Sequence, residues 1–182
     1  MINGKAYSNR LLASLVLLLS LLVAVAGSWA QETRSGLWRV ATDAELKALI
    51  PPRAPVVQER IETELRTASG ITDGKGRFVA GVVLITAGYS AEGKYSHYFI
   101  AQVPMKIGDF RLNAGEYLIG WKHNEDSLTV NFYEAASGKF LGSVEAVKNA
   151  AITRVESFRI WPPADKSVIQ IGRFTFSYQL ES

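Results

Sequence analysis

The chain has 182 residues, no cysteine and two histidines, and 48% of its residues are hydrophobic. Its 20 basic and 17 acidic residues give a formal net charge of +3, of which Lys5 and Arg10 supply two charges close to the N-terminus. The nearly neutral remainder gives no electrostatic reason to expect nucleic-acid binding, and a chain without cysteine forms no disulfides and uses no thiolate chemistry.

Residues 1–30 have the layout of a secretory signal peptide. Lys5 and Arg10 precede an uncharged apolar run that ends at Gly27, and Ser28 and Ala30 are the small residues that signal peptidase requires. Cleavage would give a periplasmic or secreted protein of one domain. The alternative is an uncleaved segment, since residues 11–30 are about long enough to cross a bilayer as a helix. That segment would then be the protein's link to a membrane.

Residues 31–55 predict a short helix and a proline-rich connector. Thr42 and Glu45 have the spacing of a capping box, and an apolar stripe with Leu46 follows them. Pro51 and Pro52 then end the helix, because proline cannot continue the backbone hydrogen bonding. We expect a helix near residues 43–50 and an extended connector to about residue 55.

Residues 56–182 have the periodicity of β-strands. The first stretch fits two patterns, because Val57, Ile61 and Leu65 are spaced as on a helix while apolar and charged residues alternate between positions 60 and 67. We favour the strand. Further alternating segments, separated by turn residues, lie at 78–89, 94–103, 115–121, 128–133, 140–144, 155–161 and 167–180. This spacing predicts a single antiparallel β-sandwich, or a small barrel.

The last of these segments changes the parity of its apolar positions. Ile169 and Ile171 occupy odd positions, whereas Phe174 and Phe176 occupy even ones. A change of face within one strand requires a bulge or a bend, and Gly172 is the residue that permits it. We therefore predict one bent strand over residues 167–180.

The histidines and acidic residues are the candidates for chemistry. His97 and His123 could form a metal or acid–base site if they met in space with Glu125 or Asp126. The interpretation that we favour is two rim or surface histidines, each with one local hydrogen bond, and an ordinary turn. The sequence contains neither a Gly-x-Ser-x-Gly motif nor a glycine-rich phosphate loop before a helix. We expect no enzyme, no metal and no cofactor.

Aromatic residues are spread along the predicted strands, where most would form core or cross-strand pairs. Trp121 and Trp161 each end a strand beside a turn, and a ring at such a rim can contact a ligand. Strand alternation places Tyr95 on the same face as His97, and His123 begins the turn after Trp121. The candidate ligand-binding residues are Trp121, Trp161, Tyr95, His97 and His123.

Two segments resemble motifs of known families. Gly36-Leu37-Trp38 is similar to the G-x-W triplet near the start of lipocalins, which implies a barrel that carries a small apolar ligand. Residues 110–121 resemble a motif, L-x-AG-x-Y, that leads into a strand in exported bacterial β-sandwich proteins of largely uncharacterised function. The second resemblance covers more of the chain. It implies a sandwich module of the periplasm or cell surface, with no catalytic residues to transfer.

Two classes of function remain open. The favoured one is an exported, non-catalytic module that acts by contact with another envelope protein. The alternative is a lipocalin-like carrier of a small apolar ligand, or a glycan-binding module. A carrier needs an apolar cavity of about 300 Å³ or more, whereas a module has a filled core, and we expect the filled core.

Overall fold

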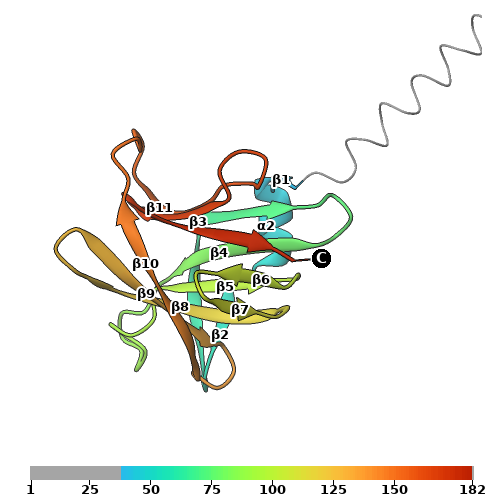
Figure 1. The fold of residues 1–182 in the computed structure, drawn as a ribbon. Coiled ribbons are helices and arrows are strands. Elements are labelled where there is room, and N and C mark those ends of the chain that lie inside the picture. The colour runs from blue at the N-terminus through green and yellow to red at the C-terminus, as the bar shows by residue number, and fades with distance from the viewer. Residues whose placement is uncertain (1–37, 182) are drawn as a thin grey trace, which may run out of the picture. The chain divides into compact units, whose positions relative to one another are not determined.

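The computed structural model describes residues 38–181, which form antiparallel β-strands and one helix (Figure 1). This confirms the predicted mainly β fold with a short N-terminal helix. The predicted signal peptide, and Gly36 and Leu37 of the G-x-W triplet, lie outside the described residues. None of the helical segments in the described part of the chain is long and apolar enough to span a bilayer.

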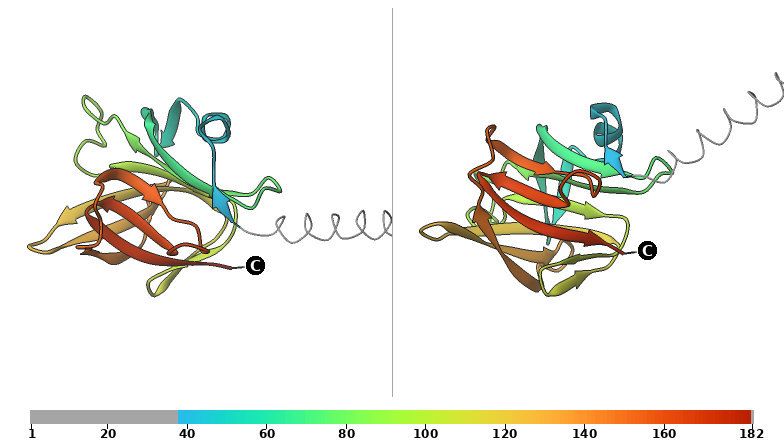
Figure 2. Two further views of the ribbon diagram at one scale, coloured as in Figure 1. Left: turned by 90° about the horizontal axis from the view of Figure 1, so that it is seen from above. Right: turned by 45° about the horizontal axis from the view of Figure 1, so that its top comes forward.

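Helix α2 (Asp43–Leu49) begins at the predicted capping box. The Glu45 backbone N–H donates to Thr42 Oγ1 at 3.3 Å, and the Thr42 N–H donates to the Glu45 carboxylate at 2.8 Å. These two bonds satisfy backbone donors that the first turn of a helix otherwise leaves free. Leu46 and Ile50 are buried on the side that faces β3 (Glu59–Thr72), where the helix lies in Figure 2.

The stretch after residue 56, which fits both a helix and a strand pattern, forms the strand β3, as we favoured. Strand β2 (Arg53–Val56) spans residues 55 and 56, where we placed the boundary between the connector and the β-domain. Together with β3, the strands of the described residues are β1 (Arg39–Val40), β2 (Arg53–Val56), β4 (Phe78–Leu84), β5 (His97–Ala101), β6 (Met105–Ile107), β7 (Phe110–Leu112), β8 (Gly115–His123), β9 (Ser127–Glu134), β10 (Phe140–Lys148), β11 (Glu156–Ile160), β12 (Val168–Gly172) and β13 (Phe174–Leu180).

The strands follow one curved path in the order β1-β3-β4-β5-β8-β9-β10-β13-β12-β11. β2 pairs with β3, and β6 pairs with both β7 and β13. At the end of the path β11 returns beside β3 and β4 (Figure 1). There the Ile160 N–H donates to Ser69 Oγ at 3.0 Å. The sheet is therefore a nearly closed barrel, in which a side chain of β3 contacts the backbone of β11, the last strand of the path.

The prediction of one bent strand over residues 167–180 is wrong. β12 and β13 form an antiparallel hairpin in which Ile171 pairs with Phe174. The loop consists of Gly172, with a φ of 62°, and Arg173. A glycine with positive φ at the first position suits a two-residue hairpin turn. The apolar parity changes because the chain reverses, and both sets of apolar residues face the barrel interior.

The two ends of the barrel differ. The β6–β7 hairpin lies at one end, where Met105, Ile107 and Leu112 are almost completely buried and β6 pairs with the last residues of β13. At the opposite end β5 begins, β8 ends and β13 begins. In Figure 1 the β8–β9 turn marks this end at the left, and the β6–β7 hairpin marks the other at the right.

Aromatic rings pack in the interior beside the β6–β7 hairpin. The Phe132 ring packs edge-on against Phe99 and Phe176, with ring centroids 6.1 and 6.0 Å apart. A second apolar cluster covers the outer face of β4, β5 and β8, where α2, β2 and the loop at residues 85–96 contribute Leu46, Val56 and Tyr95. These aromatic rings and the covered outer face hold the strands that shape the opposite end.

Candidate functional site

The open end of the barrel contains a pocket of about 580 Å³. We call it the end pocket and define it by its lining residues. They come from β4, β5, β8, β9, β11, β12, β13 and the loop at residues 85–96, and they are Val83, Leu84, Thr86, Gly93, Lys94, Tyr95, Ser96, His97, Trp121, His123, Leu128, Ser157, Ile171, Gly172 and Phe174. The expectation of a wholly filled core is therefore wrong at this end.

Strand register explains why these side chains converge. Val83 pairs with His97 across β4 and β5, and His123 pairs with Leu128 across β8 and β9. Paired residues of antiparallel strands point to the same side of a sheet, and alternate residues along a strand do so too. The last interior positions of several strands thus meet at one end of the barrel.

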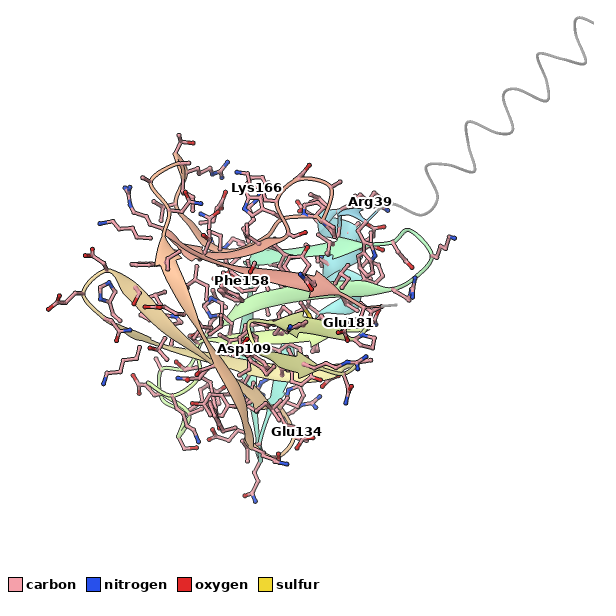
Figure 3. All side chains as sticks on the ribbon, in the orientation of Figure 1. Arg39, Asp109, Glu134, Phe158, Lys166 and Glu181 are labelled. Atoms are coloured by element: carbon pink, nitrogen blue, oxygen red, sulfur yellow. The ribbon has the colours of Figure 1, made fainter. Side chains whose placement is uncertain are left out.

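Phe158 packs against His97 beside the end pocket, without being one of its lining residues. Its ring is buried, lies 5.0 Å from the His97 ring between centroids, and is labelled near the middle of the fold in Figure 3. A Cβ atom at Gly81 would come within 2.4 Å of Cε1 of Phe158. The glycine therefore makes room for the phenyl ring, and the ring in turn supports the imidazole.

His97 is the most enclosed polar residue of the pocket wall, with 3% of its surface exposed. Its Nδ1 lies 2.8 Å from Ser96 Oγ, which is also 3.1 Å from the Ile119 carbonyl oxygen. Nε2 has almost no accessible surface and makes no well-formed hydrogen bond within the described residues. Burial lowers the pKa of His97 to about 4, and a weaker hydrogen-bonding interaction with the Ser157 backbone opposes that shift. The imidazole is therefore neutral near pH 7.

The rim of the end pocket is aromatic. Trp121 has 44% of its surface exposed, and the exposed His123 ring packs edge-on against Phe174 with centroids 5.5 Å apart. His123 is thus a rim histidine, as the favoured interpretation expected. His97 is instead deeply buried.

Tyr95 borders the pocket but does not share a face with His97, contrary to the prediction. The strand begins only at His97, and the Tyr95 ring packs in the outer cluster, edge-on to Tyr133 with centroids 5.2 Å apart. The Lys94 ammonium lies 5.0 and 5.6 Å from the centroids of these two rings. The contact with Tyr95 raises the pKa of Lys94. The lysine charge is therefore directed toward the outer tyrosines.

Trp161 does not join the other candidates. Its Nε1–H donates to Gln170 Oε1 at 3.2 Å. Arg159 and Lys166 place their cationic groups 4.2 and 4.4 Å from its ring centroid, and Lys166 is labelled in Figure 3. These cation–π contacts occupy the ring, which leaves less of it available for stacking on a sugar.

The structure brings both histidines to one pocket without the acidic partner that the metal-site alternative required. Glu125 and Asp126 lie in the β8–β9 turn and do not line the end pocket. Within residues 38–181, no three histidine or carboxylate side chains gather into a group that could hold a metal ion.

Sequence reasoning missed several lining residues. Phe174 and Ile171 belonged to a segment predicted as one strand, and Ser96 and Ser157 carried no motif. The alternation of side chains along a strand predicts which residues of β5 share a face with His97, but it says nothing of residues on other strands. The residues across the pocket come from β11, β12 and β13, which no local pattern pairs with β5.

No protein-family model, no curated protein and no solved structure matches the chain. The resemblances to lipocalins and to exported β-sandwich proteins therefore stay hypotheses. Within the second motif, the Tyr117 hydroxyl donates to the Asn113 carbonyl at 2.7 Å, which closes the turn before β8.

Proposed function

We propose that the protein binds a small, largely apolar molecule in the end pocket, as a carrier or receptor and not as a catalyst. The observation that supports this most strongly is the pocket's mainly apolar lining at one end of the barrel. The pocket's volume of about 580 Å³ falls within the roughly 300–1,000 Å³ typical of small-molecule sites, and barrel mouths are frequent locations for such sites.

The chemistry of the lining agrees with an apolar occupant. Leu84, Leu128, Ile171 and Phe174 contribute hydrocarbon and aromatic surface, while His97, Ser96 and Thr86 contribute a few polar groups. A mainly apolar wall with a small number of polar groups is the usual composition of a ligand pocket. Trp121 at the rim adds an aromatic face that could contact a ligand or a glycan as it enters.

The proposal includes export of the protein through the signal peptide at residues 1–30, to the periplasm or the exterior. The supporting features are Lys5 and Arg10, the apolar run and the small residues before Gln31. N-terminal sequencing of protein recovered from native envelope and secreted fractions tests this part, because cleavage gives Gln31 as the first residue. An intact N-terminus in a membrane fraction would instead support the anchored form.

Binding can be tested with N-phenyl-1-naphthylamine, whose fluorescence rises in apolar sites. We expect one saturable site, and at least tenfold weaker binding by Val83→Phe, which adds a ring to the interior face beside His97. Ile171→Phe fills the pocket from the opposite wall and serves if Val83→Phe folds poorly. The matched control is Val40→Phe at an exposed site on β1 outside the end pocket. Absence of saturable binding, or equal binding by all variants, would refute the proposal.

The second candidate function is a module that contacts another envelope protein. It is favoured by Phe140 and Val147 on β10, which are 54% and 55% exposed and lie outside the end pocket. Cross-linking in intact cells should then give a defined adduct that Phe140→Ser and Val147→Ser abolish together. Val83→Phe should leave this adduct unchanged, so the two candidate functions are separable.

A further inference from the structure

Basic side chains border the mouth of the end pocket. Lys148, the last residue of β10, pairs with Phe174, the first residue of β13. Residues paired in this way point to the same side of a sheet, and Phe174 lines the end pocket. Lys148 therefore projects from the pocket side of the sheet. Because the residue is exposed, its ammonium group lies in solvent at the mouth.

Two further polar residues lie at the same place. Arg173 is exposed in the turn between β12 and β13 and follows Gly172, which lines the pocket. The Arg173 carbonyl oxygen accepts from the Asn149 N–H at 2.9 Å, which holds the turn next to the end of β10 (Figure 1). The exposed His123 ring packs edge-on against Phe174. The mouth thus combines two cationic side chains with an imidazole around one pocket-lining phenyl ring.

Protein carboxylates do not neutralise these two cations. Within residues 38–181, neither Lys148 nor Arg173 takes part in an ion pair. Glu92, Glu125 and Asp126 are exposed in the neighbouring loops and pair with neither cation. None of the described residues that line the end pocket is acidic. This distribution of charge favours an anion over a cation at the mouth.

The wall of the pocket limits where a charged group can lie. Leu128 and Ile171 contribute hydrocarbon to the interior side. Lys94 lines the pocket, but its ammonium lies over the rings of Tyr95 and Tyr133 in the outer cluster. A charge placed deep in the pocket would lose its hydration without gaining a counter-ion, which is costly. A charged group therefore suits the mouth, and hydrocarbon suits the interior.

We infer that the natural ligand of the end pocket is an amphipathic acid, whose anionic group lies at the mouth within reach of Lys148 and Arg173. Its apolar body lies among Leu128, Ile171 and Phe174. The inference rests on the proposed function and adds the chemical class of the ligand to it. In this arrangement the apolar wall supplies most of the affinity, because ion pairs in solvent are weak. The two cations are specificity residues that distinguish an acid from a neutral or basic molecule of the same shape.

Calorimetry near pH 7 with three ligands that share one butylphenyl body tests the inference. The ligands are the anion 4-butylbenzoate, the neutral 4-butylphenol and the cation of 4-butylbenzylamine. We expect the benzoate to bind about three- to tenfold more tightly than the phenol, the gain that two exposed ion pairs supply. The amine should bind most weakly. The advantage of the benzoate should shrink as the ionic strength rises from about 0.01 M to about 1 M, because salt screens exposed charges.

Variants that remove one charge identify the residues responsible. Lys148→Gln and Arg173→Gln should each weaken binding of the benzoate by about two- to fivefold and leave binding of the phenol unchanged. Both side chains are exposed, so the variants should fold as the wild type does. The matched control is Lys106→Gln, which removes one positive charge from an exposed position on β6 at the opposite end of the barrel. It should bind all three ligands as the wild type does.

A ¹³C NMR titration of 4-butylbenzoate labelled at its carboxyl carbon locates the anionic group. The pKa of the bound ligand should lie below that of the free acid, because nearby cations favour the charged form. A raised pKa would show a carboxyl group buried away from the cations and would overturn the inference. Equal affinity for benzoate and phenol, tightest binding of the amine, or a benzoate preference that survives both substitutions would also overturn it. All these results leave the proposed function intact, whereas failure of all three ligands to bind would count against both.

Discussion

Replacing His97 with glutamine should flatten the pH dependence of stability between about pH 6.5 and pH 4. The imidazole has an ordinary pKa of 6.5 in the unfolded chain, and burial lowers it to about 4 in the folded protein. Between these values the unfolded chain holds a proton that the folded protein does not. Stability contributed by His97 is therefore complete above about pH 6.5 and is lost as the pH falls to about 4.

The size of the effect follows from the difference between the two pKa values. Each unit corresponds to about 1.4 kcal/mol, so acidification from pH 6.5 to pH 4 should cost the wild type about 3 kcal/mol through this one residue. Urea unfolding at a series of pH values measures it. Carboxylates titrate in both the wild type and His97→Gln. The difference between the two free energies of unfolding, taken at each pH, therefore isolates the contribution of the imidazole.

A control separates titration from packing. Leu128→Ala removes buried hydrocarbon from the same pocket wall and should lower the free energy of unfolding by about 2–5 kcal/mol, yet it should keep the wild-type pH dependence. A His97→Gln protein with the same slope as the wild type would refute the reasoning, because the imidazole would then not be held neutral by burial.

Three further substitutions test the fold around the pocket. Gly81→Val should cost about 1–3 kcal/mol through overpacking, since a Cβ there meets the Phe158 ring; an unchanged urea midpoint would show that Phe158 does not occupy this position. Thr42→Ala should lower the free energy of unfolding by about 1 kcal/mol, because it removes the helix cap, whereas Thr42→Ser should keep most of that stability. Thermal unfolding measures both variants, and an equal loss of stability in the two would exclude a cap made by the hydroxyl group. Gly172→Ala should lower the free energy of unfolding by about 1–2 kcal/mol. The cause is backbone strain at a φ of 62°, because a Cβ at this position meets no neighbouring atom. An unchanged melting temperature in calorimetry would contradict the hairpin geometry.

Local patterns were sufficient for much of the fold. Thr42 and Glu45 marked the helix start because a capping box acts within one turn. Leu128, Val130 and Phe132 on β9 alternate with polar residues, and all three are buried in the interior of the barrel. Such signals depend on neighbours within a few residues, and for that reason a single sequence carries them.

The reversal at Gly172 does not follow from the sequence, because a parity change of the apolar positions fits both a bulge and a turn. Local sequence does not decide between them; the pairing of Ile171 with Phe174 does. The dipeptide Gly172-Arg173 between two apolar segments is the local feature that indicates a two-residue turn.

The end pocket could not be predicted for a related reason. His97 and Trp121 were chosen separately as candidates, and nothing in the spacing showed that β5 and β8 are adjacent. Along each strand, a residue that lines a pocket alternates in the same way as one in a filled core. The difference arises from where the strands end and from the β6–β7 hairpin, which lies only at the opposite end.

Site-specific ¹⁹F NMR on protein labelled with 5-fluorotryptophan tests the central claim most directly. Trp121 lines the end pocket, whereas Trp38 and Trp161 do not. Addition of 4-butylphenol should shift the Trp121 resonance saturably and leave those of Trp38 and Trp161 in place. A Trp121 resonance that does not respond at saturating ligand, or shifts of equal size at Trp38, Trp121 and Trp161, would contradict a binding site at the open end of the barrel.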